Sequence, residues 1–188
     1  PGAAAELYRE VQNAGLEVDQ LVNNAGFGDS GLFADADEVK LANMLRLNVL
    51  ALTQLTRLFL PEMISRGYGR IMNVGSTGSF APTPTMAVYC ASKAYVLSFT
   101  EALSEELKKT GVTATALCPG VTVTGFQKEA DVEKSFMVGM FRMTAESVAR
   151  KGYKAMIKGK RTRITGIFNK LLVASTKMTP KWILLKLG

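Results

Sequence analysis

Residues 69–93, GRIMNVGSTGSFAPTPTMAVYCASK, decide the fold prediction. The stretch opens with an apolar, β-branched run that is typical of a buried strand, and it continues through a loop rich in Gly, Pro and Thr. A helix is expected from about Val88, and it carries Tyr89 and, four residues later, Lys93. Residues at positions i and i+4 lie on one face of a helix, so the phenol and the ammonium can reach the same space.

Strands and helices alternate along the rest of the chain. Short apolar runs predict strands at 17–22, 70–75, 112–117 and 162–166. Helical spacing of apolar residues, with Gly or Pro at the ends, predicts helices at 1–15, 38–66, 88–109 and 145–157. This alternation is typical of crossover units around an open parallel sheet, so the fold class is α/β.

The composition fits a single domain covering residues 1–188. Hydrophobic residues make up 47% and charged residues 21%, which argues against disorder. The longest apolar runs are shorter than the roughly 20 residues of a membrane-spanning helix. Two cysteines form neither a disulfide framework nor a zinc site, which fits a reducing compartment, so a cytoplasmic location is expected.

The chain has no histidine. This excludes the Ser-His and Cys-His nucleophile pairs and most zinc or non-haem iron sites, and no metal is expected. Acid–base chemistry must therefore fall to Tyr, Lys, Asp or Glu.

Charge is distributed unevenly. All 16 acidic residues precede position 147, whereas 11 of the 23 Lys and Arg residues lie from Arg150 onward. Residues 167–188 combine apolar side chains with lysines, and two interpretations stay open for this basic apolar tail. The lysines can solvate an apolar helix that packs on the domain, or the tail can contact a membrane surface, which would make the protein membrane-associated. Nucleic acid is not expected, because no surface alternates aromatic and basic residues.

Small, turn-forming residues follow three of the predicted strands: Asn24-Ala25-Gly26, Gly75-Ser76 and Pro119-Gly120. The carboxyl ends of parallel strands meet at one edge of a sheet, where open α/β sheets bind their ligands. Asn48 lies inside the predicted helix 38–66, where an asparagine is mildly unfavourable.

A tyrosine can act as an acid or base near neutral pH only if its pKa falls from about 10. A neighbouring cation favours the phenolate, and Lys93 is placed to be that cation. A shift of roughly 3 units would bring the pKa of Tyr89 near the operating range. Ser76 can polarise a substrate carbonyl, and Asn48 can hold a water that relays protons to Lys93. Each residue alone also has an ordinary explanation, as part of a solvated helix face, a turn or a satisfied core.

Taken together, these motifs resemble the classical branch of the short-chain dehydrogenase/reductase family in order and spacing: Asn23-Asn24-Ala25-Gly26, Asn48, Ser76, Tyr89-x-x-x-Lys93 and the segment from Pro119 to Thr124. The resemblance implies a Rossmann-like, doubly wound sheet and hydride transfer between NAD or NADP and a carbonyl or alcohol. It implies a catalytic tetrad of Asn48, Ser76, Tyr89 and Lys93.

The resemblance also implies a cofactor site. Asn24, Ala25 and Gly26 would lie beside a ribose of the cofactor, and Tyr89 and Lys93 would bind the nicotinamide ribose. The remaining residues would meet the nicotinamide carboxamide: Pro119, Gly120, Thr122 and Thr124. The sequence does not distinguish NAD from NADP.

The sequence departs from the family pattern at its start. It contains no TGxxxGIG element, which in the family cradles the pyrophosphate at a helix N-terminus. The sheet is therefore expected to be the C-terminal part of the family's sheet, with about four strands and an exposed edge at 17–22. Two alternatives stay open for function: an incompetent fragment or assembly module of this fold, and a sugar-nucleotide epimerase or dehydratase.

Residues 125–158 include the region where the family keeps its substrate loop. Between 126 and 143 the sequence is rich in Phe and Met, which suggests a lipophilic substrate, although packing explains these residues equally well. The family uses the helices that correspond to 38–66 and 88–109 for dimerisation, so a homo-oligomer is expected by resemblance.

Because the pyrophosphate-binding element is missing from the sequence, we expect residues 1–188 alone to be inactive and to bind dinucleotides weakly or not at all. Titrating NADH and NADPH against the chain, followed by cofactor fluorescence, measures this directly. Micromolar affinity for either nucleotide would contradict the expectation.

Overall fold

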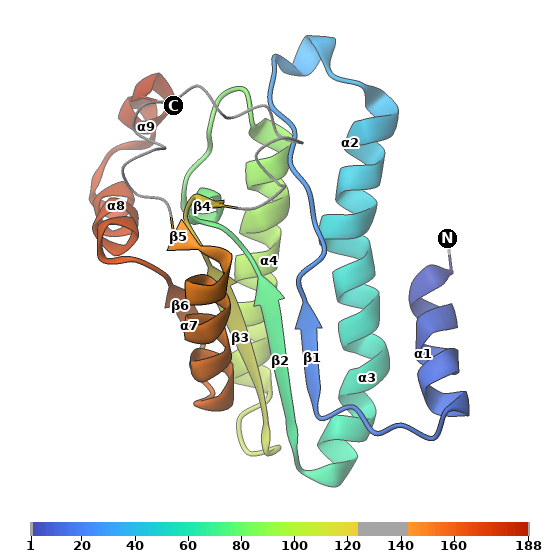
Figure 1. The fold of residues 1–188 in the computed structure, drawn as a ribbon. Coiled ribbons are helices and arrows are strands. Elements are labelled where there is room, and N and C mark those ends of the chain that lie inside the picture. The colour runs from blue at the N-terminus through green and yellow to red at the C-terminus, as the bar shows by residue number, and fades with distance from the viewer. Residues whose placement is uncertain (1, 124–142, 188) are drawn as a thin grey trace.

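A computed structural model describes residues 2–123 and 143–187 of the chain. Its centre is a four-stranded sheet made of β1 (Gln20–Asn23), β2 (Gly69–Val74), β3 (Val112–Cys118) and β6 (Thr162–Ile164). All three pairings are parallel and the strand order is β1-β2-β3-β6 (Figure 1). The predicted open parallel α/β sheet of about four strands is therefore confirmed.

Burial along the strands follows their place in the sheet. The two inner strands, β2 and β3, are buried along most of their length, whereas β1 alternates between exposed and half-buried residues. Val22 on this outer strand is 45% exposed. The strand begins at Gln20 rather than at the predicted residue 17, and the Val18 carbonyl accepts a hydrogen bond from Arg66 at 2.8 Å.

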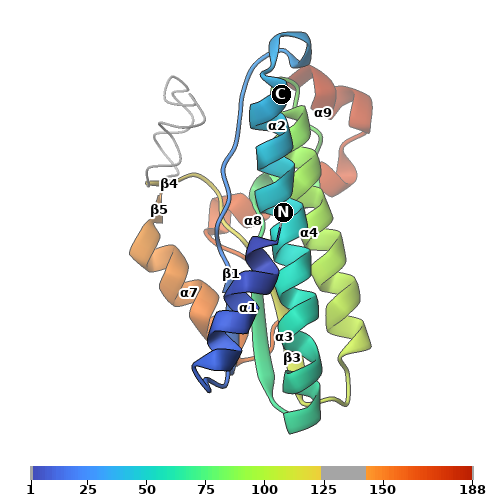
Figure 2. The same cartoon turned by 90° about the vertical axis from the view of Figure 1, so that its right-hand side faces the viewer.

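Helices cover the sheet on two sides (Figure 2). On one side lies a long rod formed by α2 (Glu38–Leu45), the π-helical segment η2 (Arg46–Ala51) and α3 (Leu52–Arg66), with α4 (Ala87–Glu106) beside it. The short helix α1 (Ala3–Asn13) packs on α3. On the other side α7 (Ala145–Ile157) packs on β2 and β3.

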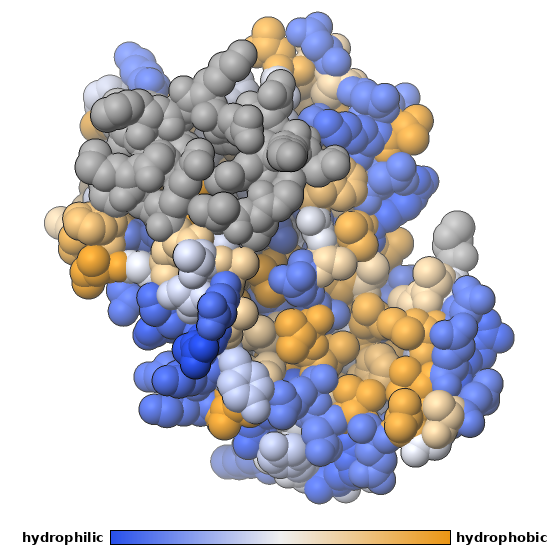
Figure 3. All heavy atoms as spheres, in the orientation of Figure 1, coloured by the Kyte–Doolittle hydropathy of each residue, from blue (hydrophilic) through white to orange (hydrophobic). Residues whose placement is uncertain are grey.

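The main core lies between the sheet and the helices α3 and α4. Its buried members are Phe59, Met63, Ile71, Leu103, Leu107, Val112 and Ala114. A smaller cluster under α7 contains Met72, Leu117, Val148 and Met156. In front of β1 and β2, between α1 and α7, the surface is apolar (Figure 3).

The last part of the described chain differs most from the sequence prediction. A parallel pair of two-residue strands, β4 (Thr122–Val123) and β5 (Met143–Thr144), was not predicted, because two residues carry no periodic signal. The tail forms two helices, α8 (Ile167–Met178) and α9 (Lys181–Leu187). Within residues 2–123 and 143–187, every helix is too short or too polar to cross a bilayer.

Candidate active site

The turns after β2 and β3 are joined by backbone hydrogen bonds. The Gly75 amide donates to the Leu117 carbonyl at 2.8 Å, and the Thr77 amide donates to the Pro119 carbonyl at 2.9 Å. These bonds fix the turn that carries Ser76 against the turn that carries Gly120. The carboxyl ends of the two inner strands are therefore held together at one edge of the sheet. The topology of an open sheet places a ligand site at this edge.

Ser76 is held at the start of the short 3-10 helix η3 (Thr77–Phe80). Its hydroxyl accepts a hydrogen bond from the Gly78 amide at 3.0 Å, and its own amide donates to the Ser79 hydroxyl at 3.2 Å. Its side chain also shares a hydrogen bond with Tyr89. The predicted meeting of Ser76 and Tyr89 is thus present, and the turn itself orients the serine.

Lys93 lies one turn further along α4 and is 5% exposed. Its Nζ donates to the Val74 carbonyl at 2.9 Å and lies 6.0 Å from the centre of the Tyr89 ring. Because burial disfavours a charge, it lowers the pKa of Lys93 to about 8. The ammonium therefore sits at the end of β2, as the spacing from Tyr89 predicts.

The net pKa shift of Tyr89 is opposite in direction to the lowering that a neighbouring cation would produce. Burial of the phenol raises the pKa of Tyr89, and the hydrogen bond with Ser76 opposes this rise without reversing it. The physical reason is that the phenol is 9% exposed, while the Lys93 cation is directed to the Val74 carbonyl. Tyr89 therefore keeps its proton at neutral pH.

Asn48 lies in the π-helical segment η2 and is 1% exposed. Its Nδ2 donates to the Phe27 carbonyl at 2.9 Å and to the Ser92 hydroxyl at 3.1 Å, and its Oδ1 accepts from the Phe27 amide at 3.2 Å. The Ser92 hydroxyl donates to the Tyr89 carbonyl at 2.7 Å. This chain of bonds ties the segment after β1 to the first turn of α4.

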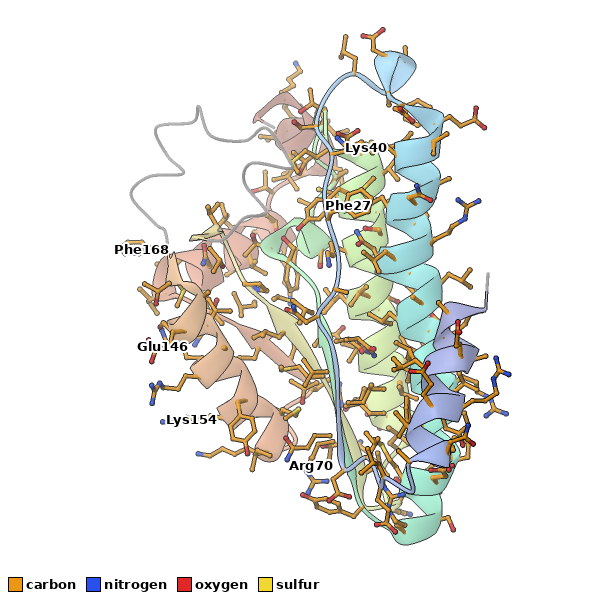
Figure 4. All side chains as sticks on the ribbon, turned by 45° about the vertical axis from the view of Figure 1, so that its right-hand side comes forward. Phe27, Lys40, Arg70, Glu146, Lys154 and Phe168 are labelled. Carbon is orange, nitrogen blue, oxygen red and sulfur yellow. The ribbon has the colours of Figure 1, made fainter. Side chains whose placement is uncertain are left out.

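Gly26 explains why the segment after β1 can come so close to the site. A Cβ atom on this residue would lie 2.8 Å from Asn48 Oδ1 and 3.3 Å from Lys93 Nζ. The next residue, Phe27, lies in the long segment that rises from β1 (Figure 4). Only glycine leaves the amide of Asn48 and the ammonium of Lys93 in place around this turn.

The other predicted cofactor residues lie on either side of this centre. Asn24 and Ala25 are exposed at the end of β1, and β2 separates them from the end of β3. There the Thr122 hydroxyl donates to the Gly120 carbonyl at 2.9 Å, and Pro119 is half-buried. Thr124 lies outside the described residues, as does the Phe- and Met-rich sequence from 125 to 142.

A small pocket of about 80 Å³ opens beside Tyr89. Its lining is mostly apolar and comes from the segment after β1, from α2 and from the start of α4: Asp29, Gly31, Leu32, Phe33, Ala36, Leu41, Met44, Thr85, Met86, Ala87, Val88 and Tyr89. A larger hollow of about 350 Å³ lies between α1 and the end of α3. We assign the site to the smaller pocket, because Tyr89 is one of its lining residues.

Sequence reasoning missed Ser92 and Asn169. Ser92 is three residues after Tyr89 and therefore on its helical face, so the spacing alone was a usable signal. Asn169 of α8 fills the space above Gly120, where a Cβ would lie 2.3 Å from its Nδ2. Gly120 and Asn169 are 49 residues apart in the chain, so no local sequence pattern indicates their contact.

The family model described as short chain dehydrogenase matches residues 2–135. The chain belongs to the short-chain dehydrogenase family. Ketoacyl reductase HetN of Nostoc sp. is 36% identical over 182 residues, which cover 93% of this chain and 62% of that protein. The very-long-chain 3-oxoacyl-CoA reductase of Mus musculus is 29% identical over 97% of this chain and 58% of its own length.

A solved structure of the same family has a similar fold. The short-chain dehydrogenase from Sphingobium yanoikuyae in complex with NADPH matches with a TM-score of 0.79 and 26% sequence identity. The match covers 95% of this chain and 70% of that one. The chain thus spans about three fifths of the length of the two curated family members above.

We predict that Lys93 makes stability depend on pH in the alkaline range. Its pKa is about 8 in the folded chain against an ordinary value of 10.5, so between these values the unfolded chain binds more protons. Stability attributable to Lys93 therefore rises with pH through this window, by at most about 1 kcal/mol per pH unit. Below about pH 8 both states are protonated and the burial penalty is constant.

The measurement is urea unfolding of wild type and Lys93→Met across this window. Burial also raises the pKa of Cys118, to about 12, which lowers stability at higher pH, and Lys93 itself acts on this pKa. Both proteins therefore carry Cys118→Ala, which removes the thiol from the comparison. Lys154→Met, on the exposed side of α7, is the matched control. A difference curve for Lys93→Met as flat as that of the control would contradict the prediction.

We predict that Ser92→Ala destabilises the fold by about 1–2 kcal/mol, because it leaves the buried Asn48 amide with one acceptor fewer. Ser98→Ala, an exposed serine on the same helix, should change stability by less than about 0.5 kcal/mol. Equilibrium urea unfolding compares the two. Equal effects would show that the Asn48–Ser92 bond contributes nothing measurable.

Proposed function

We propose that the protein is an NAD(P)-dependent oxidoreductase that interconverts a carbonyl and an alcohol, with Tyr89 as its acid and base. One observation carries the proposal. In a chain without histidine, the Tyr89 phenol is hydrogen-bonded to Ser76 and lies one helical turn from a buried lysine. The names of the Nostoc and mouse relatives, both reductases of oxoacyl compounds, support the same reaction class.

The residues present fit a nicotinamide dinucleotide. Gly26 leaves room for Lys93 Nζ, whose remaining donors can meet ribose hydroxyls, and the turn after β3 offers backbone groups at Gly120 and Thr122 for a carboxamide. Asn24 and Ala25 lie exposed at the end of β1, where they can meet the second ribose. The NADPH complex of the Sphingobium neighbour supports this class of cofactor. When bound, the nicotinamide supplies or accepts the hydride.

This chain's own residues handle the proton. Because burial raises the pKa of Tyr89, its hydroxyl is protonated at neutral pH and can donate a proton to a carbonyl oxygen. Ser76 would hold the same oxygen and orient it toward the phenol. In the reverse direction the phenolate must form, and a protonated Lys93 on the same helical face favours it. Asn48 would position the water that returns the proton through Lys93.

The substrate we propose is a lipophilic carbonyl compound. The pocket beside Tyr89 is lined by Leu32, Phe33, Leu41, Met44 and Met86, and its polar rim includes Asp29, which pairs with Lys40 at 2.6 Å. Apolar walls around few polar groups favour an apolar group, and a pocket of about 80 Å³ has room for the part of the substrate next to its carbonyl. The mouse relative's name, which specifies a very-long-chain 3-oxoacyl-CoA, supports this choice.

We also propose that the protein is a homo-oligomer in a reducing compartment such as the cytoplasm. The rod formed by α2, η2 and α3 exposes Val39, Leu45 and Leu50, which are 44–67% exposed, and an apolar helix surface of this kind can pair with a second copy. Cys90 and Cys118 are both free thiols buried near the site.

The test is turnover of a long-chain 3-oxoacyl thioester with NADPH or NADH. It uses the protein produced in its natural host and purified from it, and each variant is produced and purified from the same host. Tyr89→Phe removes the proton donor, so we expect kcat to fall about 100- to 10,000-fold while NADPH affinity changes little. The matched control is Tyr95→Phe on the same helix, whose hydroxyl pairs with Thr53 away from the site. Turnover that survives Tyr89→Phe would overturn the assignment, and absence of turnover in wild type would favour a non-catalytic module.

A further inference from the structure

The helices α8 and α9 carry an exposed surface that the proposed reaction does not use. We call it the α8–α9 face and define it by six apolar side chains and four lysines: Ile167, Leu171, Leu172, Met178, Trp182, Leu185, Lys170, Lys177, Lys181 and Lys186. The six apolar residues are 49–89% exposed. Figure 1 shows both helices on the side of the molecule opposite α1.

The helix α8 has an inner and an outer side with different chemistry. Asn169 and Val173, four residues apart, are 9% and 3% exposed and anchor its inner side. Leu171 and Met178, seven residues apart, share the outer side and are 61% and 89% exposed. The two lysines of α8 are also seven residues apart, so they form a cationic flank beside this apolar stripe.

The helix α9 continues the same pattern. Trp182 is 63% exposed and Leu185 is 49% exposed, and lysines occupy positions 181 and 186. Lys186 Nζ lies 5.7 Å from the centre of the Trp182 ring. A tryptophan with neighbouring lysines is typical of helices at a membrane–water interface, where the ring sits at headgroup level and the ammonium groups meet phosphates.

The charge of the α8–α9 face indicates whether a second copy of the chain or a lipid surface binds it. From Arg150 to the end the chain has 11 basic and no acidic residues, so the α8–α9 face has no acidic group in its own helices. Two copies joined through this face would bring lysines against lysines, which is unfavourable. An anionic lipid surface offers phosphates for the lysines and acyl chains for the apolar stripe at the same time.

We propose that the α8–α9 face docks onto an anionic membrane, with both helices lying in the plane of its surface. This inference goes beyond the proposed reaction and does not depend on it. The docked orientation would place the active site near the lipid, because α8 packs on η3, next to Ser76, and Asn169 covers Gly120. In Figure 1, α9 lies at the end of the molecule where α4 begins.

The experiment uses vesicles of phosphatidylcholine and phosphatidylserine in equal parts, with pure phosphatidylcholine vesicles as the neutral comparison. Trp182 is the only tryptophan in the chain, so its fluorescence reports on the α8–α9 face alone. We expect the emission to shift to the blue and to resist acrylamide quenching when anionic vesicles are added at low salt. Co-sedimentation gives the partition coefficient, which should fall as salt rises.

Variants separate the apolar and charged contributions. Leu171→Ser with Leu172→Ser should lower the partition coefficient by more than about tenfold, because two exposed side chains no longer enter the lipid. Lys170→Glu with Lys177→Glu should lower it by more than about fivefold per residue. Lys154→Glu with Lys158→Glu makes the same change of charge on α7 and at the residue that follows it, where both lysines are exposed, and should have a much smaller effect. Figure 4 shows Lys154 on α7 and Phe168 at the outer edge by α8.

Three results would overturn the proposal. The first is no binding to anionic vesicles at low salt. The second is a blue shift that grows with protein concentration in the absence of lipid, which would assign the face to a second copy of the chain. The third is binding that the leucine variants leave unchanged, or binding that the α7 lysine variants weaken as much as the α8 lysine variants do. Either result would indicate that charge alone attracts the protein to the vesicles. Circular dichroism of each variant shows that it is folded.

Discussion

The site depends on the burial of the Lys93 ammonium against the Val74 carbonyl. Removing a cation from water costs free energy, so a buried ammonium is found only where the surrounding structure provides a hydrogen-bond acceptor for it. Here the partner is the last carbonyl of β2, and the lysine reaches it because it follows Tyr89 by one turn of α4. The same burial moves two pKa values in opposite directions, down for Lys93 and up for Tyr89. Because their ordinary pKa values are 10.5 for Lys93 and 10.0 for Tyr89, the two groups that exchange a proton in the proposed reaction are thereby moved further apart in pKa.

The parts around this pair act as a frame. The π-helical segment turns the Asn48 side chain toward Phe27 and Ser92, and Gly26 gives that side chain room. The bonds from Gly75 and Thr77 to the turn after β3 hold Ser76 from the other direction. Family membership supports the proposed reaction class, and the apolar lining of the pocket beside Tyr89 supports the proposed lipophilic substrate.

Much of the fold could be predicted from local sequence. The helix 145–157 has the predicted bounds, and β2 and β3 lie within a residue of theirs, because buried strands and amphipathic helices carry strong periodic signals. The edge strand β1 is shorter than predicted, and the pair β4 and β5 was missed, because both depend on distant partners. The spacing of Ser76, Tyr89 and Lys93 predicted their convergence correctly. It did not predict the direction in which the pKa of Tyr89 moves.

Residue type and spacing alone establish which chemistry is available: no histidine, a Tyr-x-x-x-Lys helix, small residues after three strands, and a basic tail without acids. These are properties of residue type and spacing, which the chain carries before it folds. The folded arrangement sets how deeply Tyr89 and Lys93 are buried, which groups Asn48 binds and which side of α8 faces outward. The physical reason is that desolvation and hydrogen-bond partners come from residues far apart in the chain, and no local pattern encodes them.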